Sequence, residues 1–287
     1  MKSRIFVVLA VLAALTMAGC AASGDEIGKP PLEEEVTDGN GSGNDLPDED
    51  IPEVELPEEE ESPEEEEEEL PEPVIPTAKY VSLLSDGVNI RKGAGTGYAV
   101  LGAAEKNTRY AYLGEVDGWY KIEYKNSTAY ISKKYAQITE MTASANETIE
   151  NVIREGTKLL GTKYVYGAVR YHDGKGNKLS SFTTSAFDCS SLMQYMFYMG
   201  ADGLLLGVTT RNQVLQGKTV SRAELQRGDL MFFTNSTRYN KTGVERIGHV
   251  ALYLGDNMIL HTASDYAKIE EISAARWKYY IQSQRMI

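Results

Sequence analysis

The chain has 287 residues, of which 42% are hydrophobic and 25% charged, enough for one large globular domain or two small ones. The net charge of −13 is segregated, because residues 25–72 hold 23 of the 42 acidic residues, and the scattered basic side chains of the remainder exclude a nucleic-acid partner. Two cysteines exclude a disulfide framework and a zinc site with four cysteine ligands.

Residues 1–20 are typical of a bacterial export signal. A basic start precedes an apolar run over residues 5–18, which is too short to span a bilayer. The sequence LTMAGC at residues 15–20 resembles a lipobox, although Met17 stands where leucine is usual. This resemblance implies that the thiol of Cys20 is lipidated and anchors the protein to the membrane. A plain secretory signal is the alternative, and both predict work outside the cytoplasm.

Residues 21–76 are predicted to be a disordered acidic linker. They contain six consecutive glutamates at residues 64–69 and too little apolar surface to offset the chain entropy of folding. Repulsion between like charges and the presence of prolines favour an extended chain. A calcium-binding acidic tract is the alternative to a solvated spacer, and we favour the spacer.

Residues 78–140 are predicted to be a small all-β barrel. Short alternating runs are separated by turn residues at 88–91, 98–101, 109–113, 119–124 and 128–132. The sequences VNIRKGAGT, GWYKI and AYI within them resemble a bacterial SH3-like (SH3b) domain. This resemblance implies binding to cell-wall material or packing against a catalytic domain. The aromatic residues of this region either form a sugar- or peptide-binding face or pack in the core of the barrel, and we favour the core for most. They are Tyr110, Tyr112, Trp119, Tyr120, Tyr124 and Tyr130.

The C-terminal region, residues 144–287, carries the candidate chemistry. A capping box at residues 144–147 (Ser-x-x-Glu) and apolar residues at helical spacing predict an amphipathic helix that ends near Gly161. A polar, irregular stretch over residues 168–186 follows, and within it we expect His172 to lie in a surface loop.

Cys189 is predicted to lie at the start of a second helix. Apolar residues at helical period follow it, and either Asp188 or Ser190 is suited to cap the helix. Unpaired amide groups and the helix dipole stabilise a thiolate at that position, which favours a nucleophile. A buried structural cysteine is the alternative, and the helix alone does not decide between them.

Two histidines favour the nucleophile. His249 begins an alternating strand, and a three-residue loop after Leu254 would pair that residue with Met258 on the return strand. His261 is then the diagonal neighbour of His249, at roughly 7 Å between backbones. One imidazole can accept the proton of the Cys189 thiol, and the second imidazole can orient the first. A zinc site from Cys189 and both histidines is the alternative, although a compact ligand spacing is lacking.

Four ordered motifs resemble the NlpC/P60 family over roughly residues 146–270. They are FDCSSL at 187–192, LQRGDLMFF at 225–233, GHVALYLG at 248–255 and MILHTA at 258–263. The resemblance implies an α+β, papain-like fold that hydrolyses bacterial cell-wall stem peptides between D-glutamate and a diamino acid, without a metal or other cofactor. It implies Cys189 as nucleophile, His249 as general base and His261 as the residue that orients it.

The resemblance also implies substrate contacts. Tyr164 matches a family tyrosine near the nucleophile, where it is placed to bind the oxyanion or the substrate. Asp188 and Ser190 match residues that bind the free α-amino group of L-alanine in related enzymes that trim shortened stems. A buried aromatic and a structural helix cap are the alternatives for Tyr164 and Asp188, and we expect Arg211 to be structural.

There are departures from the family pattern. Ser191 stands where glycine is usual, and the stretch between Gly167 and Asp188 is longer than the common spacing, which suggests an insertion at the rim of the cleft. The preferred hypothesis is a membrane-tethered, extracytoplasmic peptidoglycan hydrolase that works through a thioester. A non-catalytic wall-binding lipoprotein, and an acyltransferase or amidase on the same fold, are the alternatives.

Overall fold

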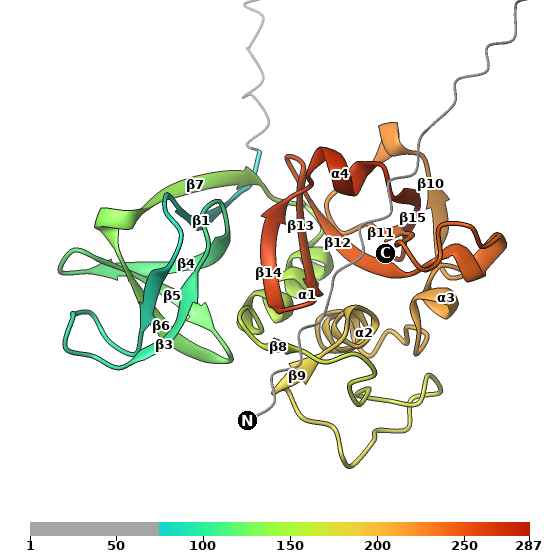
Figure 1. Cartoon of the computed structure of the whole chain (residues 1–287), viewed down its shortest axis with the longest axis horizontal. Coiled ribbons are helices and arrows are strands. Elements are labelled where there is room, and N and C mark those ends of the chain that lie inside the picture. The colour runs from blue at the N-terminus through green and yellow to red at the C-terminus, as the bar shows by residue number, and fades with distance from the viewer. Residues whose placement is uncertain (1–74) are drawn as a thin grey trace, which may run out of the picture. The chain divides into compact units, whose positions relative to one another are not determined.

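The computed structural model describes residues 75–287, and the predicted signal segment, Cys20 and nearly all of the acidic linker lie outside the described residues. The described residues form a β barrel followed by an α+β domain (Figure 1). Within residues 75–287, the helices are too short and too polar to cross a membrane.

Seven strands build the barrel. They are β1 Thr77–Leu83, β2 Val88–Arg91, β3 Val100–Ala104, β4 Arg109–Val116, β5 Trp119–Tyr124, β6 Ser127–Ser132 and β7 Ala136–Thr142. The sequence predicted β2 to β6 but not β1 and β7, which pair with each other along their whole length. Tyr110 and Tyr124 are buried in the barrel core, as the core interpretation expected, and Tyr112 and Tyr120 pack against that core.

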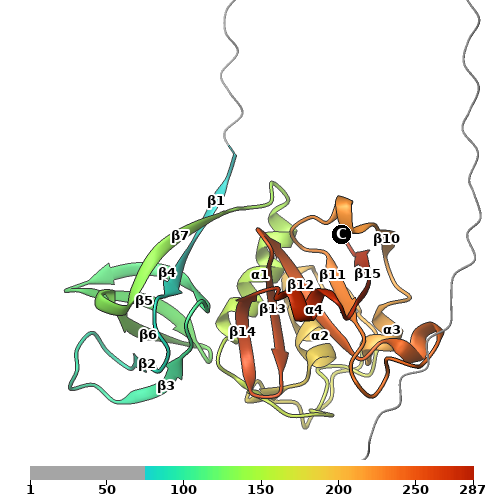
Figure 2. The same cartoon turned by 45° about the horizontal axis from the view of Figure 1, so that its top comes forward.

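The C-terminal domain packs its helices against an antiparallel sheet with the strand order β10-β15-β11-β12-β13-β14. The helices are α1 Glu147–Lys158, α2 Cys189–Gly200, α3 Thr210–Gln213 and α4 Ala274–Trp277. The strands are β8 Lys163–Tyr164, β9 Ala186–Phe187, β10 Lys218–Val220, β11 Leu230–Phe233, β12 His249–Gly255, β13 Met258–Ala263, β14 Tyr266–Glu271 and β15 Tyr280–Arg285. Helix α2 lies against α1 and against strands β12 and β13 (Figures 1 and 2).

The alternating side chains of the sheet are buried on both faces. Phe232, Val250 and Leu252 join the main core with α1 and α2, whereas Met231 and Ala251 belong to a smaller apolar cluster. Burial of both faces holds β12 and β13 in a defined register, which positions the side chains at their ends.

The predicted start of α1 is wrong. Asn146, not Ser144, caps the helix, and its side chain accepts a hydrogen bond from the N–H of Thr148 at 3.0 Å. Ser144 instead accepts from the N–H of Asn146, and its own N–H donates to Glu150. An asparagine is as good a cap as a serine, and Asn146 directly precedes the first helical residue, Glu147, two residues closer than Ser144.

The expectation of a surface position for His172 is also wrong, because its side chain is 0% exposed. Residues 168–185 lie between β8 and β9 and contain no helix or strand, yet they fold back onto α2. The ring of Tyr171 packs edge-on against Tyr195 of α2, and the N–H of His172 donates to Gln194. The aromatic side chains hold this segment against α2 despite its polar composition, because burying a ring removes a large apolar surface from water.

Arg227 links three parts of the described chain. Its guanidinium pairs with Glu150 of α1 at 2.6 and 2.9 Å and donates to the carbonyl of Leu254 and the hydroxyl of Tyr80 in the barrel. Its side chain is only 6% exposed, so these protein groups rather than water satisfy its charge and its N–H donors.

Candidate active site

Cys189 is the first residue of α2, as the sequence predicted, and Asp188 is its cap. The Oδ1 atom of Asp188 accepts from the N–H of Ser191 at 2.8 Å, while the N–H of Asp188 donates to the Ser191 hydroxyl at 2.9 Å. This reciprocal capping box depends on the hydroxyl of Ser191. These two hydrogen bonds between Asp188 and Ser191 therefore fix the first turn of α2 and the position of Cys189 within it.

The environment of the thiol corrects the expectation of a thiolate. Burial, together with the charge of Asp188, raises the pKa of Cys189 to about 11. Hydrogen bonds from the backbone N–H groups of Val250 and Ser190 and of Cys189 itself act in the opposite direction and are weaker. In the free protein at neutral pH, Cys189 therefore holds its proton, because desolvation of the charged form outweighs the helix start.

The turn after β12 brings the two histidines together. Asp256 and Asn257 both have positive φ angles, of 49° and 59°, and form a two-residue turn between β12 and β13. Gly255 faces Met258, so the predicted pairing of Leu254 with Met258 is wrong by one residue, and an irregularity before Gly255 absorbs the difference.

Beyond that irregularity the pairing follows the predicted register, with Leu252 facing Leu260. The predicted proximity of the two imidazoles is confirmed, because Nε2 of His249 lies 3.0 Å from Nδ1 of His261.

A carboxylate and an arginine extend the pair of histidines. Nε2 of His261 lies 2.9 Å from Oε1 of Glu270 in β14, and Arg276 of α4 donates to the same oxygen at 2.8 Å. Burial by itself would raise the pKa of Glu270, but the hydrogen bond from His261 and the charge of Arg276 hold it at about 2. Glu270 is therefore ionised at neutral pH and can only accept hydrogen bonds.

The ionised Glu270 fixes the tautomers of both rings. His261 must donate from Nε2 to the carboxylate, so its neutral ring accepts at Nδ1, and His249 must donate from Nε2. The lone pair of His249 is then on Nδ1. Burial lowers the pKa of both histidines, that of His249 well below its usual value, so both rings are neutral at pH 7.

Cys189 lies where two hollows of the surface meet. One, of about 480 Å³, is lined by Tyr164, His249 and Arg276 as well as Cys189. The other, of about 500 Å³, is lined by Tyr164 and Cys189 together with Asp188, Ser190, Arg170, Arg211 and Arg238. The structure thus brings together the predicted residues Cys189, His249, His261, Asp188, Ser190 and Tyr164. A proton acceptor, a thiol and room for a peptide chain are together suited to nucleophilic attack on a carbonyl.

Comparison with known proteins identifies both domains. Residues 161–286 match the NlpC/P60 family, and residues 86–137 match the bacterial SH3 domain. The chain contains an NlpC/P60 domain and a bacterial SH3 domain.

The chain is similar to peptidases of bacteria over about half of its length. The chain is 30% identical over 148 residues to peptidoglycan DL-endopeptidase CwlO of Bacillus licheniformis, covering 51% of this chain and 29% of that protein. It is 27% identical over 168 residues to the gamma-D-glutamyl-L-lysine dipeptidyl-peptidase of Bacillus subtilis, covering 58% of this chain and 49% of that protein. The matches thus span less than half the length of these relatives.

A solved NlpC/P60 family protein from Bacillus cereus is 20% identical to this chain, with a TM-score of 0.39. The match covers 72% of this chain and 63% of that protein.

Three residues of the site were missed by sequence reasoning. Glu270 pairs with Ile259 in the β13–β14 ladder and so lies diagonally beside His261, which a prediction of β14 and its register would have shown. Arg276 and Arg170 reach the NlpC/P60 cleft from segments with no local sequence signal. Within residues 75–287, clusters of three or more histidine, cysteine or acidic side chains suited to a metal ion are absent.

Proposed function

We propose that this protein is an extracytoplasmic peptidoglycan hydrolase that cleaves stem peptides with a cysteine nucleophile. The observation that carries the proposal is the chain of contacts from His249 through His261 to Glu270 beside the Cys189 thiol, at an open cleft of the NlpC/P60 domain. The names of the two relatives, a peptidoglycan endopeptidase and a glutamyl-lysine peptidase, support the same substrate class.

In the proposed reaction, His249 accepts a proton and releases it twice, once in each half of the reaction. Nδ1 of His249 accepts the thiol proton as the sulfur attacks the amide carbonyl, because the resting thiol is protonated and the resting ring is neutral. The tetrahedral intermediate collapses to a thioester as its C–N bond breaks and His249 donates that proton to the leaving amine. Water then attacks the thioester, giving a proton to His249, which passes it to the sulfur as the C–S bond breaks and the thiol is regenerated.

Glu270 stabilises the charge that appears at His249 during this transfer. The imidazolium that forms donates to His261, which in turn donates to the carboxylate. The negative charge is in place before the reaction and is held by Arg276, so no reorganisation is needed at the moment of attack. His261 and Glu270 are positioning residues in this scheme, since neither touches the sulfur.

The finer points of the proposal rest on the family resemblance. We propose the bond between D-glutamate and the diamino acid as the cleaved bond, with Tyr164 near the developing oxyanion. We propose Cys20 as the lipidated residue that anchors the protein to the membrane, outside the cytoplasm, with the bacterial SH3 domain and the NlpC/P60 domain directed to the cell wall.

The test of activity uses protein lacking residues 1–24, incubated with purified peptidoglycan and defined muropeptides beside Cys189→Ala. Mass spectrometry should show fragments that end in D-glutamate and fragments that begin with the diamino acid, and both should be absent with the variant. An unchanged circular dichroism spectrum controls for folding of the variant. Failure of the folded protein to cleave any stem would contradict the hydrolase and favour a wall-binding protein.

The test of anchoring uses the full-length chain expressed in bacteria. Wild type should be recovered in the membrane fraction, and Cys20→Ala should move to the soluble extracytoplasmic fraction because the acyl chains are lost. Equal membrane association of the two would contradict the lipid anchor.

A further inference from the structure

Asp188 beside the nucleophile has no free acceptor position. Its Oδ1 accepts from the N–H of Ser191 at 2.8 Å and from the hydroxyl of Ser190 at 3.1 Å. Its Oδ2 accepts from the N–H of Gly167 at 3.1 Å and from Nη2 of Arg170 at 2.8 Å. A carboxylate offers about four lone-pair positions, and the protein itself fills all four.

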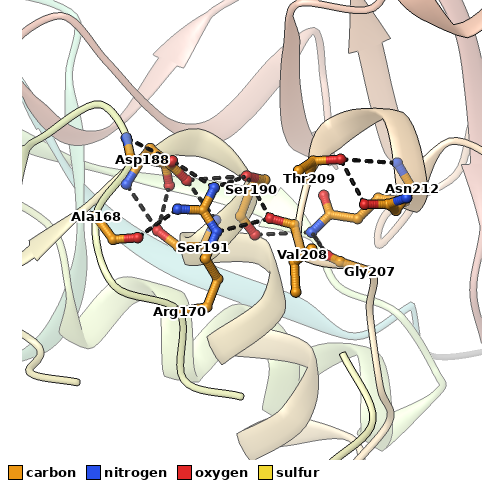
Figure 3. A network of polar contacts seen from close by, with 11 residues as sticks. Ala168, Arg170, Asp188, Ser190, Ser191, Gly207, Val208, Thr209 and Asn212 are labelled. Atoms are coloured by element: carbon orange, nitrogen blue, oxygen red, sulfur yellow. Dashed lines mark hydrogen bonds and ion pairs between the residues drawn. The ribbon is translucent and has the colours of Figure 1, made fainter. Parts of the chain in front are cut away.

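Arg170 is held in this place from several sides (Figure 3). Its Nε donates to the carbonyl of Val208 at 2.8 Å, its Nη1 donates to the carbonyl of Ala168, and its Nη2 also donates to Ser190 at 3.2 Å. Its side chain is 20% exposed, so it forms part of the cleft wall while its charge stays paired. The arginine thus contacts both residues that the family resemblance implies for binding a free amine.

The charges around this hollow are unfavourable for a cation. Arg170, Arg211 and Arg238 all line it, and Glu245 pairs with the latter two at 3.3 and 3.0 Å. With Asp188, three guanidinium groups stand against two carboxylates, and both carboxylates are already paired. An ammonium group entering here would have to displace Arg170 and would meet like charges, whereas an uncharged amide or a carboxylate would not.

We infer that Arg170 is a specificity-determining residue that excludes stem peptides with a free N-terminal amine. The substrate class is then a stem whose N-terminal L-alanine is acylated, as it is in stems still joined to the glycan strand. This inference rests on the proposed function, because it concerns the same cleft. Arg170 is a positioning residue, because it acts by pairing with the carboxylate of Asp188 and takes no part in the chemical steps.

The experiment compares two tetrapeptides, L-alanyl-γ-D-glutamyl-diamino acid-D-alanine with a free N-terminal amine and the same peptide N-acetylated. Both are made with lysine and with diaminopimelate. Wild type should cleave the acetylated peptide with a kcat/KM at least about 10-fold higher than its kcat/KM for the peptide with a free amine. Arg170→Gln should narrow that ratio about fivefold or more, because it frees an acceptor position on Asp188. Arg170→Lys, which keeps the charge, should retain most of the preference.

Arg154→Gln is the matched control, since Arg154 is an exposed residue of α1 and should leave the ratio unchanged. A wild-type preference for the free amine, or equal cleavage of both peptides, would overturn the inference while leaving the proposed function in place. So would an unchanged ratio in Arg170→Gln.

If neither peptide is cleaved, the assay on peptidoglycan decides the proposed function, and calorimetric binding of both peptides to Cys189→Ala decides the inference. Tighter binding of the acetylated peptide supports it, whereas equal or absent binding overturns it.

Discussion

Replacing Glu270 by glutamine tests the chain of contacts behind the candidate base. The change keeps the size and one acceptor oxygen, so Arg276 and His261 keep a partner, but it removes the negative charge. A hydrogen bond to a charged group contributes about 1.5–3 kcal/mol, and a neutral one about half of that. The expected loss of about 1–2 kcal/mol in the transition state lowers kcat/KM by about 5- to 30-fold.

The pH dependence separates a charge effect from a merely structural one. The hydrogen bond and charge of Glu270 raise the pKa of His261, in opposition to burial, and stabilise the imidazolium. Removing that charge lowers the pKa of the ring pair, so the acid limb of the kcat/KM profile moves to lower pH while the plateau falls. A packing defect alone would lower the plateau without moving the limb.

The assay is steady-state cleavage of a defined muropeptide between pH 4 and pH 9, with Glu271→Gln as the matched control. Glu271 is the next residue of β14, is exposed and bonds to Asn257 rather than to a histidine. The control should behave as wild type. The reasoning would be refuted if Glu270→Gln kept kcat/KM within twofold of wild type with an unmoved acid limb.

Three further predictions concern the thiol and the fold. Alkylation of Cys189 by iodoacetamide, followed by mass spectrometry, should speed up through pH 9 and above, because burial raises the pKa of the thiol to about 11. Ser191→Ala removes half of the capping box of α2 and should lower the unfolding free energy by about 1 kcal/mol, seen as a fall in Tm of about 2–4 °C. Arg227→Ala leaves Glu150 without its buried partner and should cost about 3 kcal/mol in denaturant unfolding.

Each of these three predictions has an outcome that would contradict it. An alkylation rate that levels off below pH 8 would indicate a thiolate in the free protein. A Tm for Ser191→Ala equal to that of wild type would show that the serine hydroxyl contributes nothing to the helix start. Arg154→Ala is the control for Arg227→Ala, because its side chain is exposed, and equal denaturation midpoints for the two variants would contradict the role of the buried pair.

Local patterns were sufficient for the nucleophile and its neighbours. The apolar period after Cys189 and the caps available beside it predicted the start of α2, because helix capping depends on a few adjacent residues. Alternation and a short turn placed His249 near His261, since strand register follows from the turn and the pleat. The failures at this level were small, namely a shift of one residue at the Met258 turn and the cap at Asn146.

The sequence by itself therefore determined the candidate catalytic side chains and the elements that carry them, a cysteine at a helix start and two histidines on neighbouring strands. Only the tertiary structure decided their electrostatics. Burial of Cys189 reversed the expected shift of its pKa, the register of β14 against β13 brought Glu270 to His261, and the path of residues 168–185 brought Arg170 to Asp188. Desolvation and side-chain pairing depend on which segments meet in space, and the periodicity of apolar residues does not specify either.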